Sequence, residues 1–202
     1  MKIKKWECFL AAFLIILLCT QFIIIEITSD QEELSDKLIR MHIIANSDSE
    51  EDQMLKLKVR DAVNDYFSLC LSECKNKNDA ADIITDNYDK IEAVVKNTID
   101  SYGAGYDVSV SLSDEYYPTR HYDEFSLPAG KYTSLQIKLG DADGKNWWCV
   151  VFPPLCTASI MDTELADVGL TDEEIAFIKI DSDGTVFKFK VLELISLLKE
   201  KI

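Results

Sequence analysis

One apolar segment near the N-terminus constrains this chain more than any other feature of its sequence. Residues Phe9–Ile25 form a nearly unbroken apolar run, FLAAFLIILLCTQFIII, and three lysines precede it. A run of this length lies at the short end of the roughly 17–25 residues that cross a bilayer as a helix. A buried core helix would need a polar face, but the run holds only Thr20 and Gln21. The lysines on its N-terminal side predict that the rest of the chain lies on the outer side of the membrane.

The residues after the run leave its cleavage open. A signal peptide needs small residues at its cleavage site, whereas this run continues into Glu26 and Ile27 with no Ala-x-Ala pattern. We expect residues 1–29 to form an uncleaved signal-anchor helix, with a signal peptide cut near Thr28–Asp30 as the alternative.

The remaining residues, 30–202, are enough for a single exported domain with its own core, because a chain of this size buries roughly 70% of its unfolded surface. The whole chain has a formal net charge of −15. Such a charge repels phosphate backbones and anionic lipid headgroups, so nucleic acid is not expected as a partner. The expected membrane contact is the N-terminal helix.

Four cysteines lie in the expected exported domain, where disulfides persist. Cys149 and Cys156 flank the Pro153–Pro154 turn, and a strand and turn of this kind can bring two cysteines within bridging distance. Cys70 and Cys74 are one helical turn apart, so their pairing stays open. A four-cysteine zinc site is the alternative, but the spacing of the second pair is too long for it. We therefore expect a Cys149–Cys156 disulfide, no metal and no other cofactor.

Hydrophobic periodicity divides the domain into a helical first part and a strand-rich second part. We expect a strand at 37–45 and a helix that starts within 46–52 and runs to 70. A second helix is expected to follow the break at 75–78 and to end at 102–105. Strands follow at 107–113 and 134–139. Asp143–Gly144 is expected to turn Leu139 back into Trp147–Phe152 as a hairpin. A C-terminal helix starts at 171–174, and a turn at Asp183–Gly184 precedes an amphipathic tail at 190–201. This order predicts an α+β fold, with two helices and a C-terminal helix packed on a mainly antiparallel sheet.

Catalytic patterns are few. The chain has only two histidines, and Ser47, His42 and Asp48 form a Ser-His-Asp set without a nucleophile elbow. We expect no catalytic residues. The alternative is an exported hydrolase or cell-wall enzyme that uses these residues and the cysteines, and a further alternative is a passive membrane-tethered structural domain.

The segment Asn146–Cys156 (NWWCVVFPPLC) is the most distinctive of the exported part. Adjacent tryptophans on a strand point to opposite faces of the sheet. At most one of Trp147 and Trp148 can therefore enter a one-sided core. The other one is exposed, where tryptophan is a typical anchor for protein partners, or is covered by a second layer.

Two segments together resemble one family. Lys37–Val63 (KLIRMHIIANSDSEEDQMLKLKVRDAV) is similar to the opening of the stage II sporulation protein R family. The stretch from Tyr117 through Pro128-Ala129-Gly130 to Cys156 resembles its second half. The similarity covers roughly residues 37–156. Cys70 and Cys74 depart from the pattern of the family.

The resemblance implies an intercellular signal of endospore formation, made in the forespore and exported into the space between forespore and mother cell. There it would trigger a membrane-embedded aspartic protease, stage II sporulation protein GA, which cleaves the precursor of sigma factor E. We expect the contacts with this protease to include Trp147, Trp148 and Phe152, with Arg40 and His42 as secondary candidates.

Overall fold

The computed structural model describes residues 5–122, 125–155, 165–166, 169–179 and 183–199. These ranges contain six helices and six strands whose first and last residues are given below. The helices are α1 (Lys5–Ser35), α2 (Glu50–Cys70), α3 (Lys77–Asp86), α4 (Tyr88–Ser101), α6 (Asp172–Ile178) and α7 (Asp183–Lys199). The strands are β1 (Ile39–Ile44), β2 (Val108–Tyr117), β3 (Arg120–His121), β4 (Ser126–Leu127), β5 (Gly130–Leu139) and β6 (Asn146–Phe152).

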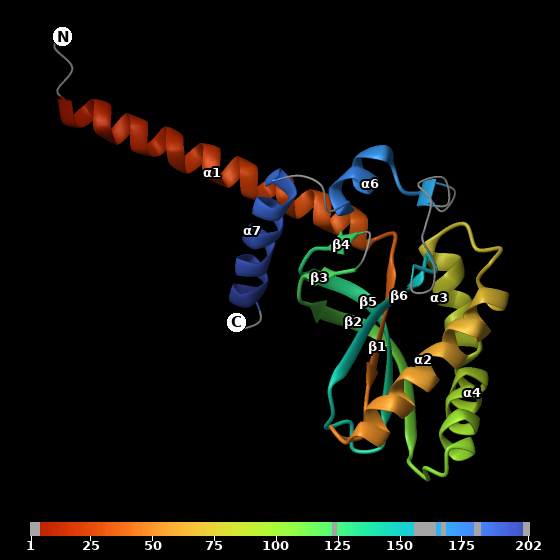
Figure 1. Ribbon diagram of the computed structural model, residues 1–202. Coiled ribbons are helices and arrows are strands. Elements are labelled where there is room, and N and C mark those ends of the chain that lie inside the picture. Colours follow the sequence, from red (N-terminus) through yellow and green to blue (C-terminus); the bar gives the residue numbers. More distant parts are fainter. Residues whose placement is uncertain (1–4, 123–124, 156–164, 167–168, 180–182, 200–202) are drawn as a thin grey trace.

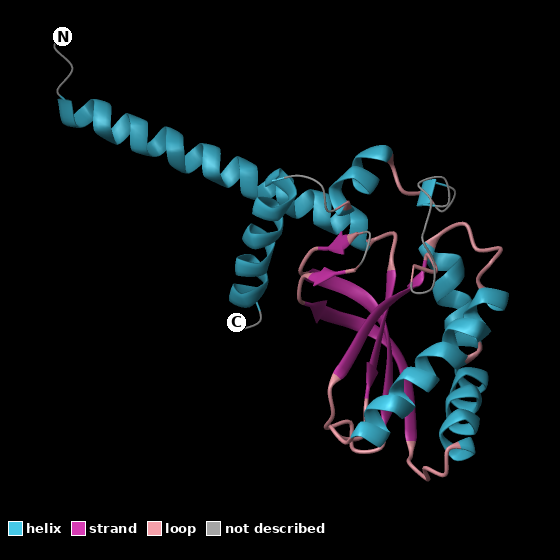
Figure 2. Ribbon diagram, in the orientation of Figure 1, coloured by secondary structure: helices cyan, strands magenta, loops and turns pink. Residues whose placement is uncertain are grey.

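The main sheet has the strand order β2-β5-β1-β6. β1 is parallel to β5, and the other two neighbouring pairs are antiparallel. This arrangement confirms the predicted α+β class with a mainly antiparallel sheet (Figure 2). The predicted hairpin was wrong, because β1 lies between β5 and β6 and pairs with both of them. A strand buried on both faces is favoured in the centre of a sheet, and every residue of β1 from Ile39 to Ile43 is buried.

One face of the sheet is covered by helices (Figure 1). Ile39, Met41 and Ile43 alternate along β1 and belong to the core cluster on this side, together with Val59 of α2 and Val95 of α4. The start of α2 is capped as expected: Ser49 accepts a hydrogen bond from the backbone N–H of Asp52. The predicted second helix is two helices, because Asn87 separates α3 from α4.

The opposite face carries a second core cluster near one end of the sheet. Ile27 and Leu34 of α1, Ile175 of α6 and Leu192 of α7 pack there against Val150 of β6. The helix predicted from 171 is confirmed, and it begins with a complete capping box at Thr171. Asp183–Gly184 was expected to be a turn, but these two residues begin α7.

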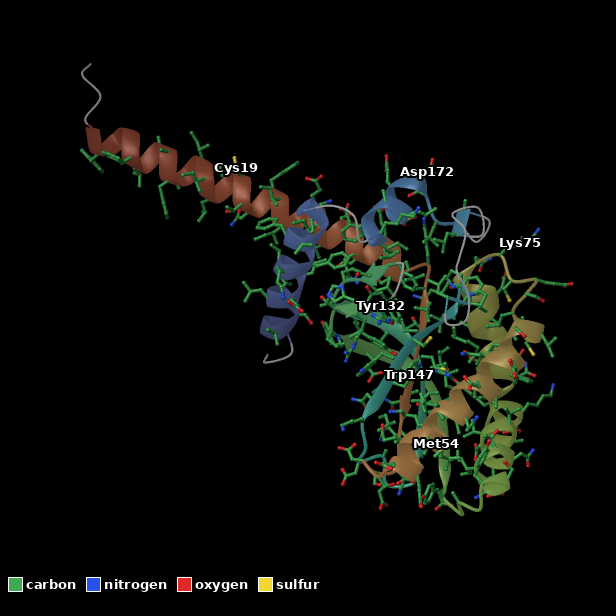
Figure 3. All side chains as sticks on the ribbon, in the orientation of Figure 1. Cys19, Met54, Lys75, Tyr132, Trp147 and Asp172 are labelled. Carbon is green, nitrogen blue, oxygen red and sulfur yellow. The ribbon has the colours of Figure 1, made fainter. Side chains whose placement is uncertain are left out.

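α1 extends far from the rest of the molecule (Figure 1). The part of α1 from Phe9 to Ser35 is long and apolar enough to cross a membrane. Only 6% of its most apolar stretch is buried in the protein. The exposed side chains include Cys19, which lies on the projecting part of the helix (Figure 3). The helix continues unbroken past the predicted boundary at residue 29, and its last turns are part of the domain core.

Candidate functional site

The two tryptophans of β6 point to opposite faces of the sheet, as the alternation of a strand requires. Both are half-buried. Trp147 packs at the border of the core cluster under α2, and the guanidinium of Arg60 lies 4.6 Å from the centre of its ring. Figure 3 labels Trp147 on β6, and its ring nitrogen Nε1 is buried with no hydrogen-bond partner among the described residues.

Trp148 packs against a polar cluster on the other face of the sheet. Its ring stacks on His42 at a centroid distance of 3.7 Å, and the ring of Tyr117 meets it edge-on at 4.7 Å. The guanidinium of Arg120 lies 5.3 Å from the centre of its ring. Trp148 is therefore held by neighbours from several strands, whereas the cation partner of Trp147 comes from α2.

Glu115 of β2 connects this cluster. One of its carboxylate oxygens lies 2.8 Å from Nδ1 of His42, and the other accepts a 2.9 Å hydrogen bond from the hydroxyl of Ser134. Gln136 also donates to Glu115, over 3.3 Å. Burial raises the pKa of Glu115, but the hydrogen bond and charge of His42 and the bonds from Ser134 and Gln136 outweigh it, so the pKa lies below its usual value. The carboxylate therefore joins β2, β5 and β1.

Arg40 lies next to this group and is fully buried. Its guanidinium packs over two tyrosine rings, 4.0 Å from the centre of Tyr117 and 4.9 Å from that of Tyr132. One of its terminal nitrogens donates to the hydroxyl of Tyr122 over 3.0 Å. Burial raises the pKa of Tyr132 to about 12, so this ring stays neutral beside the cation.

The sequence placed Arg40 and His42 on one face of a strand, which is correct, but it did not reveal Glu115, Ser134 and Tyr117 as their neighbours. A signal was present in β2, where Glu115 and Tyr117 continue the polar phase of an alternating strand. What the sequence lacks is the strand order that brings β2 near β1.

The cluster does not form the arrangement of a hydrolase. Nε2 of His42 is buried and has no hydrogen-bond partner among the described residues, so it activates no hydroxyl or thiol there. Ser47 donates instead to the carboxylate of Asp52 over 2.6 Å, and Asp48 accepts from the backbone N–H of Lys145. His42, Ser47 and Asp48 therefore do not form a triad.

Three of the five expected contact residues are not at the surface. Arg40, His42 and Phe152 have exposed fractions of 0%, 4% and 1%. A buried side chain offers no area to a partner, so their expected role as direct contacts is not supported by the structure. Trp147 and Trp148, which are half-buried, remain as candidate contacts.

Cys149 is buried in β6, and Cys156 lies outside the described residues, so their disulfide stays a prediction. Cys70 and Cys74 are free thiols. Burial and nearby acidic side chains raise the pKa of Cys74, which makes it a poor nucleophile. No group of three His, Cys, Asp or Glu side chains that could hold a metal ion occurs in the part of the chain that the structure describes.

Comparison with known proteins gives two findings. The sequence profile of the family described as stage II sporulation protein R matches residues 35–162. Stage II sporulation protein R of Bacillus subtilis (strain 168) is 41% identical over 123 residues, which are 61% of this chain and 55% of that protein. The match thus spans about half of the length of this relative. No solved structure matches the chain. Because the profile covers more than half of its length, including β1, the polar cluster and the tryptophan strand, the chain belongs to the stage II sporulation protein R family.

Proposed function

We propose that this protein is an exported intercellular signal of endospore formation. Its α1 helix carries the domain across the forespore membrane into the space between forespore and mother cell. There the domain activates a membrane-embedded aspartic protease, stage II sporulation protein GA, which processes the precursor of sigma factor E. The observation that carries the proposal is the family match over residues 35–162, joined to a projecting apolar helix directly before it.

The mechanism follows from the energetics of a two-state receptor. A ligand shifts its receptor toward the active state only if it binds that state more tightly. The protein therefore acts by binding, and its domain presents a rigid surface. The partly exposed ring of Trp147 is the candidate centre of this surface, with Trp148 behind it on the other face of β6. A Cys149–Cys156 disulfide would fix the turn that follows the strand.

The test is made in the sporulating bacterium that carries this gene. Deletion of the gene is expected to leave the sigma factor E precursor uncleaved in an immunoblot, and a copy expressed only in the forespore is expected to restore cleavage. Restoration by a forespore copy without α1 would contradict export through this helix. Normal cleavage after deletion would contradict the proposed function itself.

The alternative of an exported hydrolase is distinguished with the same readout. A variant with Ser47→Ala and Asp48→Asn removes two of the three residues of the alternative. We expect signalling to be kept, in proportion to the amount of folded protein measured by immunoblot. Complete loss of signalling by a folded variant would favour the hydrolase.

A further inference from the structure

α7 carries two apolar faces, of which only one is used by the fold. Phe189 and Leu192 are buried in the second core cluster. On the other side of the helix, four large apolar side chains are 55–62% exposed: Val186, Phe187, Leu194 and Leu197. Their spacing places them within one continuous stripe of the helix surface. We call these four residues the α7 stripe.

A salt bridge connects α7 with α1. Nζ of Lys188 lies 2.8 Å from a carboxylate oxygen of Asp30. Asp30 follows the last residue of the apolar run, Ile25, by five positions, which is about 8 Å along a helix axis. Side chains reach roughly 5–6 Å from the axis of a helix. The salt bridge therefore places Lys188 of α7 close to the C-terminal end of the apolar run in α1.

The orientation of the stripe matches this position. Figure 1 shows α7 running crosswise to α1: the helix begins beside α1 and extends along one side of the sheet. The stripe lies on the side of α7 away from the buried Phe189 and Leu192, so it is the side that does not pack in the domain core. A helix that is crosswise to a membrane-spanning helix lies along the membrane surface.

We infer that α7 is an interfacial helix that inserts the α7 stripe into the outer boundary of the bilayer crossed by α1. The inference rests on the proposed anchoring by α1. Apolar contact drives the insertion, because the domain as a whole is acidic. The spacing places Lys190 on the same side of the helix; its side chain is 74% exposed and forms a 2.8 Å salt bridge with Glu193, and its long stem allows the ammonium to lie at the level of the headgroups. With α1 and α7 both held by the bilayer, the sheet is presented in a fixed orientation.

The test uses the full-length chain in phosphatidylcholine vesicles and a photocrosslinking amino acid, benzoylphenylalanine. It is introduced singly at Phe187, at Leu194, at Phe13 of α1 as the position expected in lipid, and at the exposed Met54 of α2 as the position expected in water. We expect about tenfold more lipid adduct at Phe187 and Leu194 than at Met54, because an interfacial helix buries its apolar face roughly 5–10 Å deep. Mass spectrometry of the crosslinked peptides measures the adducts.

Three results would overturn the inference. If Phe13 forms lipid adducts but Phe187 and Leu194 form no more than Met54, α7 does not reach the bilayer, and the anchor is unaffected. If Phe187 and Leu194 crosslink to a second copy of the chain instead of lipid, the stripe is an interface between copies. If Phe13 also fails to reach lipid, the proposed anchoring falls together with the inference.

Discussion

Hydrogen-bonded carboxylates connect loops and strands of this domain. Asp52 at the start of α2 is 5% exposed. It accepts hydrogen bonds from Asn46, Ser47 and Tyr106, at 2.9, 2.6 and 2.6 Å. Burial raises the pKa of Asp52, but these hydrogen bonds outweigh it and hold the pKa below its usual value. The carboxylate thus ties the β1–α2 connection to the segment before β2.

The lowered pKa values of Asp52 and Glu115 predict a stability that depends on pH. A carboxyl with a lower pKa in the folded protein stabilises it above the unfolded pKa, which is about 3.9 for Asp and 4.3 for Glu. This contribution is lost as the pH falls through the folded pKa. We expect the free energy of unfolding, measured by urea denaturation, to decrease below about pH 4–5. A free energy that does not change between pH 6 and the acid unfolding limit would contradict the assignment.

Substitution of Asp52 tests one of these carboxylates directly. We expect Asp52→Asn to lower the free energy of unfolding at neutral pH by about 1–3 kcal/mol, because hydrogen bonds to a buried charge are lost. The variant is also expected to lose part of the acid dependence. Asp36→Asn is the matched control, since the side chain of Asp36 is 85% exposed, and it should leave both quantities nearly unchanged. Equal effects of the two substitutions would argue against a special role of Asp52.

Trp147 is the residue at which the proposed signalling surface is tested most directly. Truncation of an anchor tryptophan costs about 2 kcal/mol of binding, roughly a thirtyfold loss of affinity. We expect Trp147→Ala to reduce precursor cleavage to a comparable degree at limiting protein, with the fold verified by circular dichroism. Tyr116→Ala, on the opposite edge strand β2, is the control for loss of an exposed aromatic ring. If the Tyr116 variant loses as much signalling as the Trp147 variant, the contact surface lies elsewhere.

At the scale of elements, α1 consists of two parts that differ in their surroundings: an exposed apolar part and a buried end. Ile25 is 67% exposed, whereas Leu34, nine residues later in the same helix, is completely buried. At Gly130 of β5, a Cβ atom would collide with the amide side chain of Gln31, so the last turns of α1 approach the sheet closely. The helix passes from an exposed apolar segment to a core element without a linker.

We therefore expect Leu34→Ala to destabilise the domain by about 2–5 kcal/mol, as for other large-to-small changes in a core. Ile25→Ala in the same helix is the control and should have little effect on the unfolding of the domain. The free energy of unfolding is measured in detergent micelles by near-ultraviolet circular dichroism. Similar values for the two variants would show that the end of α1 is not part of the core.

The elements that the sequence predicted well have local signals. The cap at Ser49, the capping box at Thr171 and the alternation of Val108 and Val110 lie within a few residues of the structures they specify. The predictions that were wrong depend on contacts between residues far apart in the sequence. Asp143–Gly144 is a turn whose strands do not pair with each other, because pairing depends on β1, which is about one hundred residues away in sequence. Hydrophobic periodicity also did not reveal the break at Asn87. The buried residues of α3 and α4 follow one common helical spacing, so the two helices look like one in the sequence.

At the scale of the whole molecule, two cores lie on opposite faces of one sheet. The first core consists of α2, α3 and α4 on the sheet, and the second joins the sheet to α1, α6 and α7. The polar cluster of Arg40, His42 and Glu115 lies on the face of the second core, against which Trp148 of β6 also packs. Composition indicated an acidic exported domain, but it did not show that α1 shares a core with that domain.

The layers of the whole molecule decide which parts of the candidate site could be predicted from the sequence. Trp147 and Trp148 were identified from strand alternation alone, and their opposite directions are confirmed. Phe152, Arg40 and His42 were not distinguished from surface residues, because β1 becomes a central strand and both faces of its end are covered. Whether a polar residue is buried depends on which helices and strands pack on each face of the sheet. The residue pattern of one strand does not contain this information.

The central claim, that this protein activates a membrane protease from the outer side, is tested by reconstitution. Full-length protein in one population of vesicles is mixed with vesicles that carry the sporulation protease and enclose the sigma factor E precursor. The domain of the full-length protein faces outward, and cleavage is followed by gel. The account predicts cleavage that appears only when the protein is added and that decreases with Trp147→Ala. Absence of cleavage with folded protein and a protease shown to be competent, or equal cleavage without the protein, would contradict it.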